Sequence, residues 1–410
     1  FTPLADVDLS DLPAPDWTDG GSGQDQPRQP GQSDFGPITY RDDDPATGLA
    51  FRYYNDALDS SKHSRLPETM GGGAGVLDLD NDGWPDLYFA QGNHHPVDPS
   101  LPTTRPRQKA PATTPTDRLF RNTGTGTFED ITEQAGLAQD GYGQGVTVGD
   151  VNGDGFADVH VANIGGNRLL INNGDGTFTD DTQAAGVAGK DWSITGVIAD
   201  LNNDGLADLY VVNYLSGQDV FLPSCPPDAR NGRPCGPGDF DAAQDRFYLN
   251  AGNGRFVDAT DESGIVRPEG KGLGVVAADF DGNRRLDLFV ANDTRANFLF
   301  RNLAPADNQP VSLVESAMRA GLAFSAEGEP EGCMGIAVGD VDGDGTLDLF
   351  VTNYVSQSNT LYSLKRTRTS QTTGGFFLDR TRPAGLFDNA FSLVGWGTEF
   401  LDADLDGDLD

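Results

Sequence analysis

The chain has 410 residues, of which 63 are acidic and 28 are lysine or arginine, so its formal net charge is −35. A surface this acidic argues against nucleic-acid backbones and anionic membranes as partners, because both carry negative charge themselves. No apolar run approaches the roughly 20 residues that a membrane-spanning helix needs, so we expect no transmembrane segment.

The N-terminal stretch, residues 1–34, is rich in Pro, Gly, Asp and Gln. Such a composition buries too little apolar surface to form a core, so we expect a disordered linker. The folded domain is expected over residues 35–410. Because the chain begins at Phe1 and stops at the end of a repeat, we interpret it as a C-terminally truncated piece of a longer precursor.

One acidic nonapeptide, D-x-[DN]-x-[DN]-[GR]-x-x-D, occurs six times. Oxygen ligands at positions 1, 3, 5 and 9 of a tight loop suit Ca²⁺, which takes about six to eight oxygens, whereas Mg²⁺ keeps more water. We therefore predict up to six Ca²⁺ sites. Their ligands are Asp78, Asp80, Asp82 and Asp86 in loop one; Asp150, Asn152, Asp154 and Asp158 in loop two; Asp200, Asn202, Asp204 and Asp208 in loop three; Asp279, Asp281, Asn283 and Asp287 in loop four; Asp340, Asp342, Asp344 and Asp348 in loop five; and Asp402, Asp404, Asp406 and Asp410 in loop six.

Two other interpretations of these loops are weaker. An EF-hand needs Glu at position 12, but Phe89 and then valines stand there in the first five loops, and strands follow. Simple Asp-rich turns would not demand the ninth-position Asp. Loop four places Arg284 at position 6, where the chain reverses with positive φ and Gly is expected. We expect loop four to be the weakest site, or empty.

Each loop lies inside a longer repeat with four short predicted strands, which is typical of β-propeller blades. The second copy has strands at 145–150, after the loop, at 168–172 and at 178–182, the last within an F-x-D-x-T motif. An Ala-Gly-Leu-like tag closes each unit. We predict an all-β propeller with five complete blades and part of a sixth. Residues 38–51 resemble a fourth strand plus tag, and we expect them to close the last of seven blades.

Several long motifs carry a resemblance to a known family. They are LPETMGGGAGVLDLDNDGWPDLYFAQGN (66–93), the CGP at Cys235, GKGLGVVAADFDG (270–282), ANDTRANFLFRN (291–302) and GCMGIAVGDVDGDGTLDLFVTN (332–353). Over about residues 36–410 the chain resembles FG-GAP/VCBS repeat proteins, and more closely the bacterial relatives of cartilage acidic protein, which are associated with ASPIC/UnbV domains. The resemblance implies a Ca²⁺-binding, integrin α-like propeller of seven blades with binding or adhesion roles. Arg284 and the loss of F-x-D-x-T at 311–315 depart from the pattern.

A partner surface is expected on the face opposite the predicted Ca²⁺ loops. The two long insertions, residues 91–117 and about 214–245, connect second and third strands and should lie there, together with Tyr142, Trp192 and Trp396. Aromatic side chains on loops suit protein and carbohydrate ligands. They are equally suited to plugging the central channel, so both roles stay open.

The expected function is that of an extracytoplasmic binding or adhesion module for a protein or a carbohydrate. The sequence has no G-x-S-x-G, H-E-x-x-H, C-x-x-C or P-loop motif, so we expect no enzyme. Two alternatives stay open: a structural scaffold for a C-terminal domain, and a Ca²⁺-dependent polysaccharide-active enzyme. An enzyme would need basic residues that converge, for which Arg118, Arg168 and Arg246 are candidates.

The role of the paired cysteines depends on the compartment, and two free thiols in a cytosolic protein stay open as the alternative. Cys225 and Cys235 enclose a short loop in the second insertion, and we expect them to form a disulfide outside the cytoplasm. Cys333 is expected to be a buried small hydrophobe. His94 and His95 are too isolated to predict a metal site.

Overall fold

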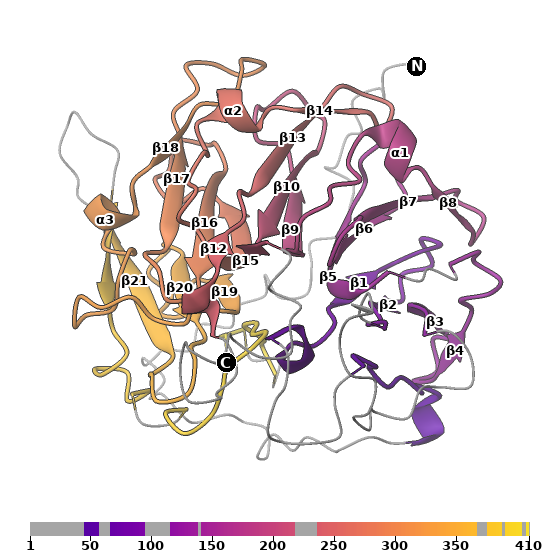
Figure 1. Cartoon of the computed structure of the whole chain (residues 1–410), viewed down its shortest axis with the longest axis horizontal. Coiled ribbons are helices and arrows are strands. Elements are labelled where there is room, and N and C mark those ends of the chain that lie inside the picture. Colours follow the sequence, from indigo (N-terminus) through magenta and orange to yellow (C-terminus); the bar gives the residue numbers. More distant parts are fainter. Residues whose placement is uncertain are drawn as a thin grey trace, which may run out of the picture.

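The computed structural model describes residues 45–56, 66–94, 115–137, 141–217, 236–366, 375–387, 390–403 and 407–409. Within these ranges, five four-stranded antiparallel sheets follow one another along the chain in a propeller-like arrangement (Figure 1). The predicted all-β fold is confirmed. The N-terminal linker, the Cys225–Cys235 pair, and Asp404, Asp406 and Asp410 of loop six lie outside the described residues.

Each sheet is built from strands that are consecutive in the chain, apart from one short ribbon inserted in the third sheet. The strands are β1 (Ala74–Leu77), β2 (Asp86–Phe89), β3 (Arg118–Asn122) and β4 (Phe128–Asp130); β5 (Gly143–Gly149), β6 (Asp158–Asn163), β7 (Arg168–Asn172) and β8 (Phe178–Asp180); β9 (Ser193–Ala199), β10 (Asp208–Asn213), β13 (Arg246–Asn250) and β14 (Phe256–Asp258); β15 (Gly272–Ala278), β16 (Asp287–Asn292), β17 (Phe298–Asn302) and β18 (Leu313–Glu315); and β19 (Ile336–Gly339), β20 (Asp348–Val351), β21 (Thr360–Arg366) and β22 (Gly375–Asp379).

The sequence did not predict the ribbon or the short helices. The ribbon pairs β11 (Leu215–Ser216) with β12 (Asp241–Ala242) inside the second insertion. Single-turn helices follow the fourth strands of the second, third and fourth sheets, and three 3₁₀ turns lie elsewhere in the described chain. They are α1 (Thr182–Ala185), α2 (Thr260–Ser263), α3 (Ala317–Ala320), η3 (Pro45–Thr47), η4 (Leu66–Thr69) and η6 (Pro237–Asp239). None of the helices in the described residues has the length and apolar character needed to cross a membrane.

The core lies between consecutive sheets. The second strands β6, β10 and β16 are buried along their whole length, as continuous apolar sequences such as DLYVVN predict. Tyr88 of the first sheet packs with Val159 and Val161 of the second, and Tyr210 of the third packs with Leu288 of the fourth. Each of the first four sheets therefore buries one face against the sheet that follows it.

Glycines allow the first strands to approach one another near the middle of the molecule, where β1, β5, β9, β15 and β19 lie (Figure 1). A Cβ atom at Gly145 would lie only 2.1 Å from the carbonyl oxygen of Ile194, and one at Gly335 only 2.1 Å from that of Trp396. The first strands line a central cavity of about 850 Å³ together with residues 396–398. Residues 396–398, at the start of the sixth repeat, therefore lie beside β19.

The tags that close each repeat pack on the next sheet. Gly264, which follows α2 with φ +93°, lies against the carbonyl of Leu313 in β18, and Gly321 lies in the same way against Phe377 in β22. Gly48 makes the equivalent approach to Phe128 in β4. Residues around Gly48 therefore occupy the place of a tag from a preceding blade. The strand predicted at residues 38–44 lies outside the described residues.

The fourth sheet compensates for its missing F-x-D-x-T motif. Elsewhere the motif's threonine accepts a hydrogen bond from the third strand, as Thr260 Oγ1 does from Phe247 N at 3.1 Å. In the fourth sheet Glu315 Oε1 accepts from Ala317 N at 2.6 Å and from Leu299 N at 3.4 Å. The Glu315 carboxylate thus accepts from the third-strand backbone N–H that is bonded to threonine in the other sheets. The fourth strand therefore forms without the motif.

Candidate metal centres

The first Asp of the nonapeptide organises the loop backbone. In loop one, Asp78 accepts hydrogen bonds from Asp82 N at 3.0 Å and Gly83 N at 2.9 Å. Its equivalents accept from the position-6 amide in all the other loops, including Asp402 from Gly407 N at 2.9 Å in loop six. Loops one to five therefore share one local structure, as their common pattern predicts, and the described part of loop six repeats its first contact.

The ninth Asp is a structural clamp, a role that the sequence analysis missed. Asp208 Oδ2 accepts from Leu201 N at 3.1 Å, and its Oδ1 accepts from Asn250 N at 2.9 Å at the end of the third strand. Asp287 makes the same two contacts in the fourth sheet. Both side chains are fully buried. This carboxylate therefore ties the loop to β13 or β17. The signal was present in the sequence, because simple turns do not require a ninth Asp.

Within the described residues, three loops bring acidic oxygens together closely enough to hold a metal ion. Ligand atoms within 4.8 Å of one another are found in three groups: Asp78, Asp80 and Asp86; Asp279, Asp281 and Asp287; and Asp340, Asp342 and Asp344. Asp80 Oδ1 and Asp348 Oδ1 are buried without a hydrogen-bond partner among the described residues. Carboxylate oxygens of this kind fit a hard divalent cation, which would satisfy them.

Loops two and three are less acidic. Asn152 and Asn202 stand at position 3, and their amide groups donate to Asp154 and Asp204 at 2.8 and 2.9 Å. Each amide oxygen accepts a hydrogen bond from the position-5 backbone N–H. These two loops retain oxygen atoms at each predicted ligand position but carry one charge fewer than loop one.

Basic side chains reach into two of the acidic groups. Arg121 of β3 lies 2.6 Å from Asp80 Oδ2, and Lys365 of β21 lies 3.2 Å from Asp344 Oδ2. Such ion pairs are partly exposed and stabilise by about 1 kcal/mol or less. They place a cationic group beside the oxygens that a metal ion would use.

Loop four keeps the loop geometry despite its arginine. Arg284 has φ +67°, and its backbone amide still donates to Asp279 Oδ2 at 2.8 Å. The positive φ that the sequence predicted at position 6 is confirmed, and for a side chain this large it costs about 1 kcal/mol. The expectation that loop four binds a cation most weakly stays a prediction.

Burial makes the ninth-position carboxyl groups weaker acids. It raises the pKa of Asp208 and of Asp287 to about 7, and that of Asp158 to about 6, with repulsion from neighbouring carboxylates adding to the effect. A bound cation would favour the ionised form of each group. Burial is thus the main reason why these carboxyl groups hold their protons, and the neighbouring carboxylates add to it.

The predicted aromatic surface residues differ in burial. Tyr142 and Trp192 are buried: the Tyr142 hydroxyl donates to Asn55 O at 3.1 Å, and Trp192 Nε1 donates to Gln144 Oε1 at 3.2 Å. Neither is available on the surface for a partner, and neither is among the residues that line the central cavity. Only Trp396 of the three is exposed, by 41%.

Other exposed aromatic residues lie near Trp396. The β20–β21 loop and residues 390–396 run beside each other, joined by hydrogen bonds from Ser356 N to Phe391 O and from Gly395 N to Asn353 O. Tyr354 and Phe391 are exposed on them. Next to them is a pocket of about 400 Å³ lined by Phe387, Phe391, Arg382, Glu331 and several hydroxyl side chains.

The structure also describes Cys333 and the three arginines that were candidates for a catalytic group. Burial raises the pKa of the Cys333 thiol to about 12, as suits a packed hydrophobe. Arg118, Arg168 and Arg246 do not converge. Each lies 3.6 to 3.7 Å from the motif aspartate of its own sheet, namely Asp130, Asp180 and Asp258.

The fold and its acidic loops define a propeller-like repeat protein with candidate cation sites. The FG-GAP-like repeat model matches residues 78–161, 150–211, 236–290 and 279–351, which together make up more than half of the chain. The chain belongs to this family. A search of curated proteins finds no match.

Solved structures with a similar arrangement are distant in sequence. An Agrocybe aegerita lectin described as recognising non-reducing terminal N-acetylglucosamine is 17% identical, with a TM-score of 0.39 over 78% of this chain and 66% of its own. The V. cholerae biofilm matrix protein Bap1 is 11% identical, with a TM-score of 0.38 over 79% of this chain and 41% of its own. The rhamnogalacturonan lyase YesW is 14% identical, with a TM-score of 0.35 over 80% of this chain and 54% of its own.

Proposed function

We propose that this protein is an extracytoplasmic, calcium-stabilised β-propeller that binds a protein or carbohydrate partner and is not an enzyme. In this proposal the complete propeller has seven blades, and the protein is a relative of the ASPIC/UnbV-associated group. Ca²⁺ stiffens the loops at one end of the blades. The partner binds at the other end.

The observation that supports calcium is the recurrence of one loop geometry, together with an unsatisfied carboxylate oxygen in loop one. Asp80 Oδ1 has no donor among the described residues, and it lies at a predicted ligand position. Ca²⁺ accepts irregular sets of oxygen ligands, whereas Mg²⁺ requires a near-octahedral set with more water. An all-oxygen donor set also disfavours zinc, which prefers nitrogen and sulfur.

The surface that supports partner binding is the exposed group Tyr354, Phe391, Leu393 and Trp396 beside the 400 Å³ pocket. Aromatic rings next to hydroxyl and carboxylate groups suit both sugars and proteins. Burial raises the pKa of Glu331 in this pocket to about 7, so near neutral pH it can donate or accept a hydrogen bond.

The experiment is a glycan-array screen of the 410-residue chain in millimolar Ca²⁺ and in chelator. Calcium-dependent binding to one glycan class supports the proposal and supplies the substrate with which to test for cleavage. Trp396→Ala should abolish this binding. Trp84→Ala is the matched control, because Trp84 is also about half exposed but lies in loop one. Absence of glycan binding would favour a protein partner or the scaffold alternative.

A further inference from the structure

Position 4 of the loops varies in a way that ligand chemistry does not explain. Loops two, four and five have glycine there with positive φ, at Gly153, Gly282 and Gly343. Loops one and three have asparagine instead, with φ +55° at Asn81 and +56° at Asn203. A residue with a side chain is uncommon in this conformation, although Asn tolerates it better than most. Asparagine is therefore present at two places where glycine fits with less strain.

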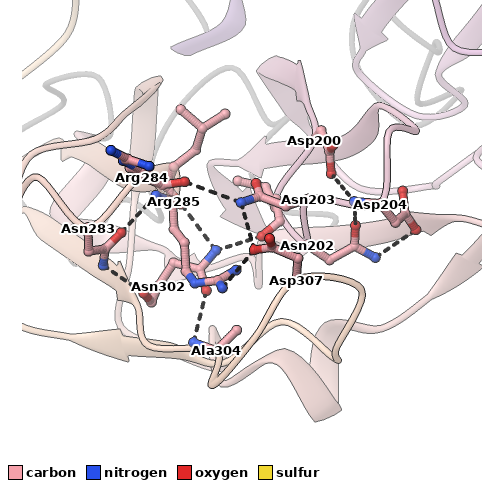
Figure 2. Close-up of polar contacts among 12 residues, drawn as sticks. Asp200, Asn202, Asn203, Asp204, Asn283, Arg284, Arg285, Asn302, Ala304 and Asp307 are labelled. Carbon is pink, nitrogen blue, oxygen red and sulfur yellow. Dashed lines mark hydrogen bonds and ion pairs between the residues drawn. The ribbon is translucent and has the colours of Figure 1, made fainter.

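Both asparagine side chains reach the next loop along the chain. Asn81 Nδ2 donates to the carbonyl oxygen of Gly155 at 3.1 Å. Asn203 Nδ2 donates to the carbonyl oxygen of Arg284 at 3.2 Å (Figure 2). Gly155 and Arg284 are the position-6 residues of loops two and four. The same contact thus occurs twice, and it joins loop one to loop two and loop three to loop four.

The peptide group that accepts this hydrogen bond is held from two loops at once. Its carbonyl belongs to position 6, and its N–H belongs to position 7. In loop four that N–H, from Arg285, donates to Asn283 Oδ1 at 2.7 Å, and in loop two Phe156 N donates to Asp154 Oδ1 at 2.9 Å. The next carbonyl along the chain, that of position 7, is the expected backbone ligand of the cation. The preceding loop therefore helps to orient the peptide beside that ligand.

Loops three and four have a second connection through the turn after β17. Asp307 Oδ1 accepts from Asn203 Nδ2 at 3.2 Å and from Arg285 Nη2 at 2.8 Å (Figure 2). Asn308 N donates to Asn202 O at 2.9 Å. Asn203 is thus at the centre of a network that includes residues from both loops.

We propose that Asn81 and Asn203 couple the cation loops in pairs, so that a Ca²⁺ ion in one loop of a pair raises the affinity of the other. The inference rests on the proposed calcium function. A cation that orders loop three fixes the backbone of Asn203, which in turn fixes the Arg284 peptide in loop four. The coupling is reciprocal by thermodynamic linkage. Asparagine suits this contact because an aspartate would repel the acidic neighbour and has no donor.

The test is a double-mutant cycle on Ca²⁺ binding by the 410-residue chain, measured by competition with a chromophoric chelator. Asp204→Asn weakens loop three and Asp281→Asn weakens loop four, and both leave in place the first Asp that holds the loop amides. With Asn203 present, Asp204→Asn should also weaken Ca²⁺ binding to loop four by about fivefold, the worth of one hydrogen bond. In an Asn203→Gly background the two substitutions should act independently.

The matched control is Asn253→Gly, the same exchange at a left-handed asparagine (φ +52°) in the β13–β14 turn. Asn203→Asp is the second test variant, since it keeps the size of the side chain and removes the donor; thermal unfolding confirms that each variant folds. Coupling lost in both Asn203 variants and kept in Asn253→Gly supports the proposal. Coupling that persists in Asn203→Gly overturns it and leaves calcium binding intact. No Ca²⁺ binding by the wild-type chain contradicts the proposed function itself.

Discussion

The third and fourth sheets have the same backbone and hold it with different side chains. In the third sheet the Tyr210 hydroxyl donates to Asp245 at 2.7 Å, and Asp245 also accepts from Asn213 N. The fourth sheet has Phe289 in the place of Tyr210, and Asn297 accepts from Asn292 N at 2.8 Å. The third sheet thus pairs the Tyr210 hydroxyl with a carboxylate, whereas the fourth sheet has Phe289 and uses the amide of Asn297. The repeat must satisfy its backbone donors, and more than one set of side chains does so.

The same lesson applies to the loops. Gly205 in loop three and Arg284 in loop four both adopt positive φ and both donate a backbone N–H to the first Asp. What does not vary between the two loops is the buried ninth Asp with its two backbone donors. We infer that hairpin formation and cation binding depend on overlapping but separable atoms.

The largest expected effect comes from removing the ninth Asp, which occurs at the equivalent position of both sheets. Asp208→Ala and Asp287→Ala each leave two backbone amides without their acceptor and should lower the free energy of unfolding by about 3 kcal/mol. Most of this loss should persist in chelator, as measured by denaturant unfolding, and in Ca²⁺ it should be larger because the same residue is a predicted ligand. Asp204→Ala in loop three is the control and should cost less than about 1 kcal/mol in chelator. A loss confined to Ca²⁺ would contradict the clamp role.

The second largest expected effect is a difference between the third and fourth sheets in how stability depends on pH. Burial raises the pKa of Asp245 to about 7 in the folded protein, well above its ordinary value of 3.8. The folded state then keeps a proton that the unfolded state has lost, so this group's contribution to stability falls as pH rises from about 4 to 7. Tyr210→Phe with Asp245→Asn reproduces the fourth sheet and should reduce that loss by more than about 1 kcal/mol. Denaturant unfolding in chelator from pH 4.5 to 8 measures it.

The first sheet offers a matched variant. Burial raises the pKa of Asp117 to about 6, and Asp117 accepts the Tyr88 hydroxyl at 2.7 Å. Tyr88→Phe with Asp117→Asn should therefore reduce the loss of stability at a pH about one unit lower than the double variant of the third sheet does. An unchanged pH profile in both double variants would show that these carboxyl groups ionise without cost.

A smaller effect is expected at position 6. Arg284→Gly relieves a left-handed arginine and should raise the free energy of unfolding by up to about 1 kcal/mol. The reverse change, Gly205→Arg in loop three, should lower it by a similar amount. Both are measured by denaturant unfolding in chelator. Equal stability of all three proteins would mean that the loop bears the arginine without strain.

The sequence predicted the repeated elements well because each is specified locally. The loop pattern fixed the turns between first and second strands, and RLFRN-like segments predicted third strands such as β3 and β7. Contacts between repeats were not predictable in this way. The burial of Trp192 depends on Gln144 and on Tyr214, whose ring packs edge-on at 5.3 Å. The link from Asn203 to Arg284 spans 81 residues and has no local pattern.

The most direct test of the account is the melting temperature of wild type and of Asp342→Asn with Asp344→Asn, each in millimolar Ca²⁺ and in chelator. These positions are preferable to Asp340, whose two oxygens hold the amides of Asp344 and Gly345 at 3.0 and 2.8 Å. The account predicts that Ca²⁺ raises the wild-type melting temperature, and that the variant loses about 3 °C or more in Ca²⁺ and little in chelator. An equal drop in both conditions, or a wild type indifferent to Ca²⁺, would contradict it.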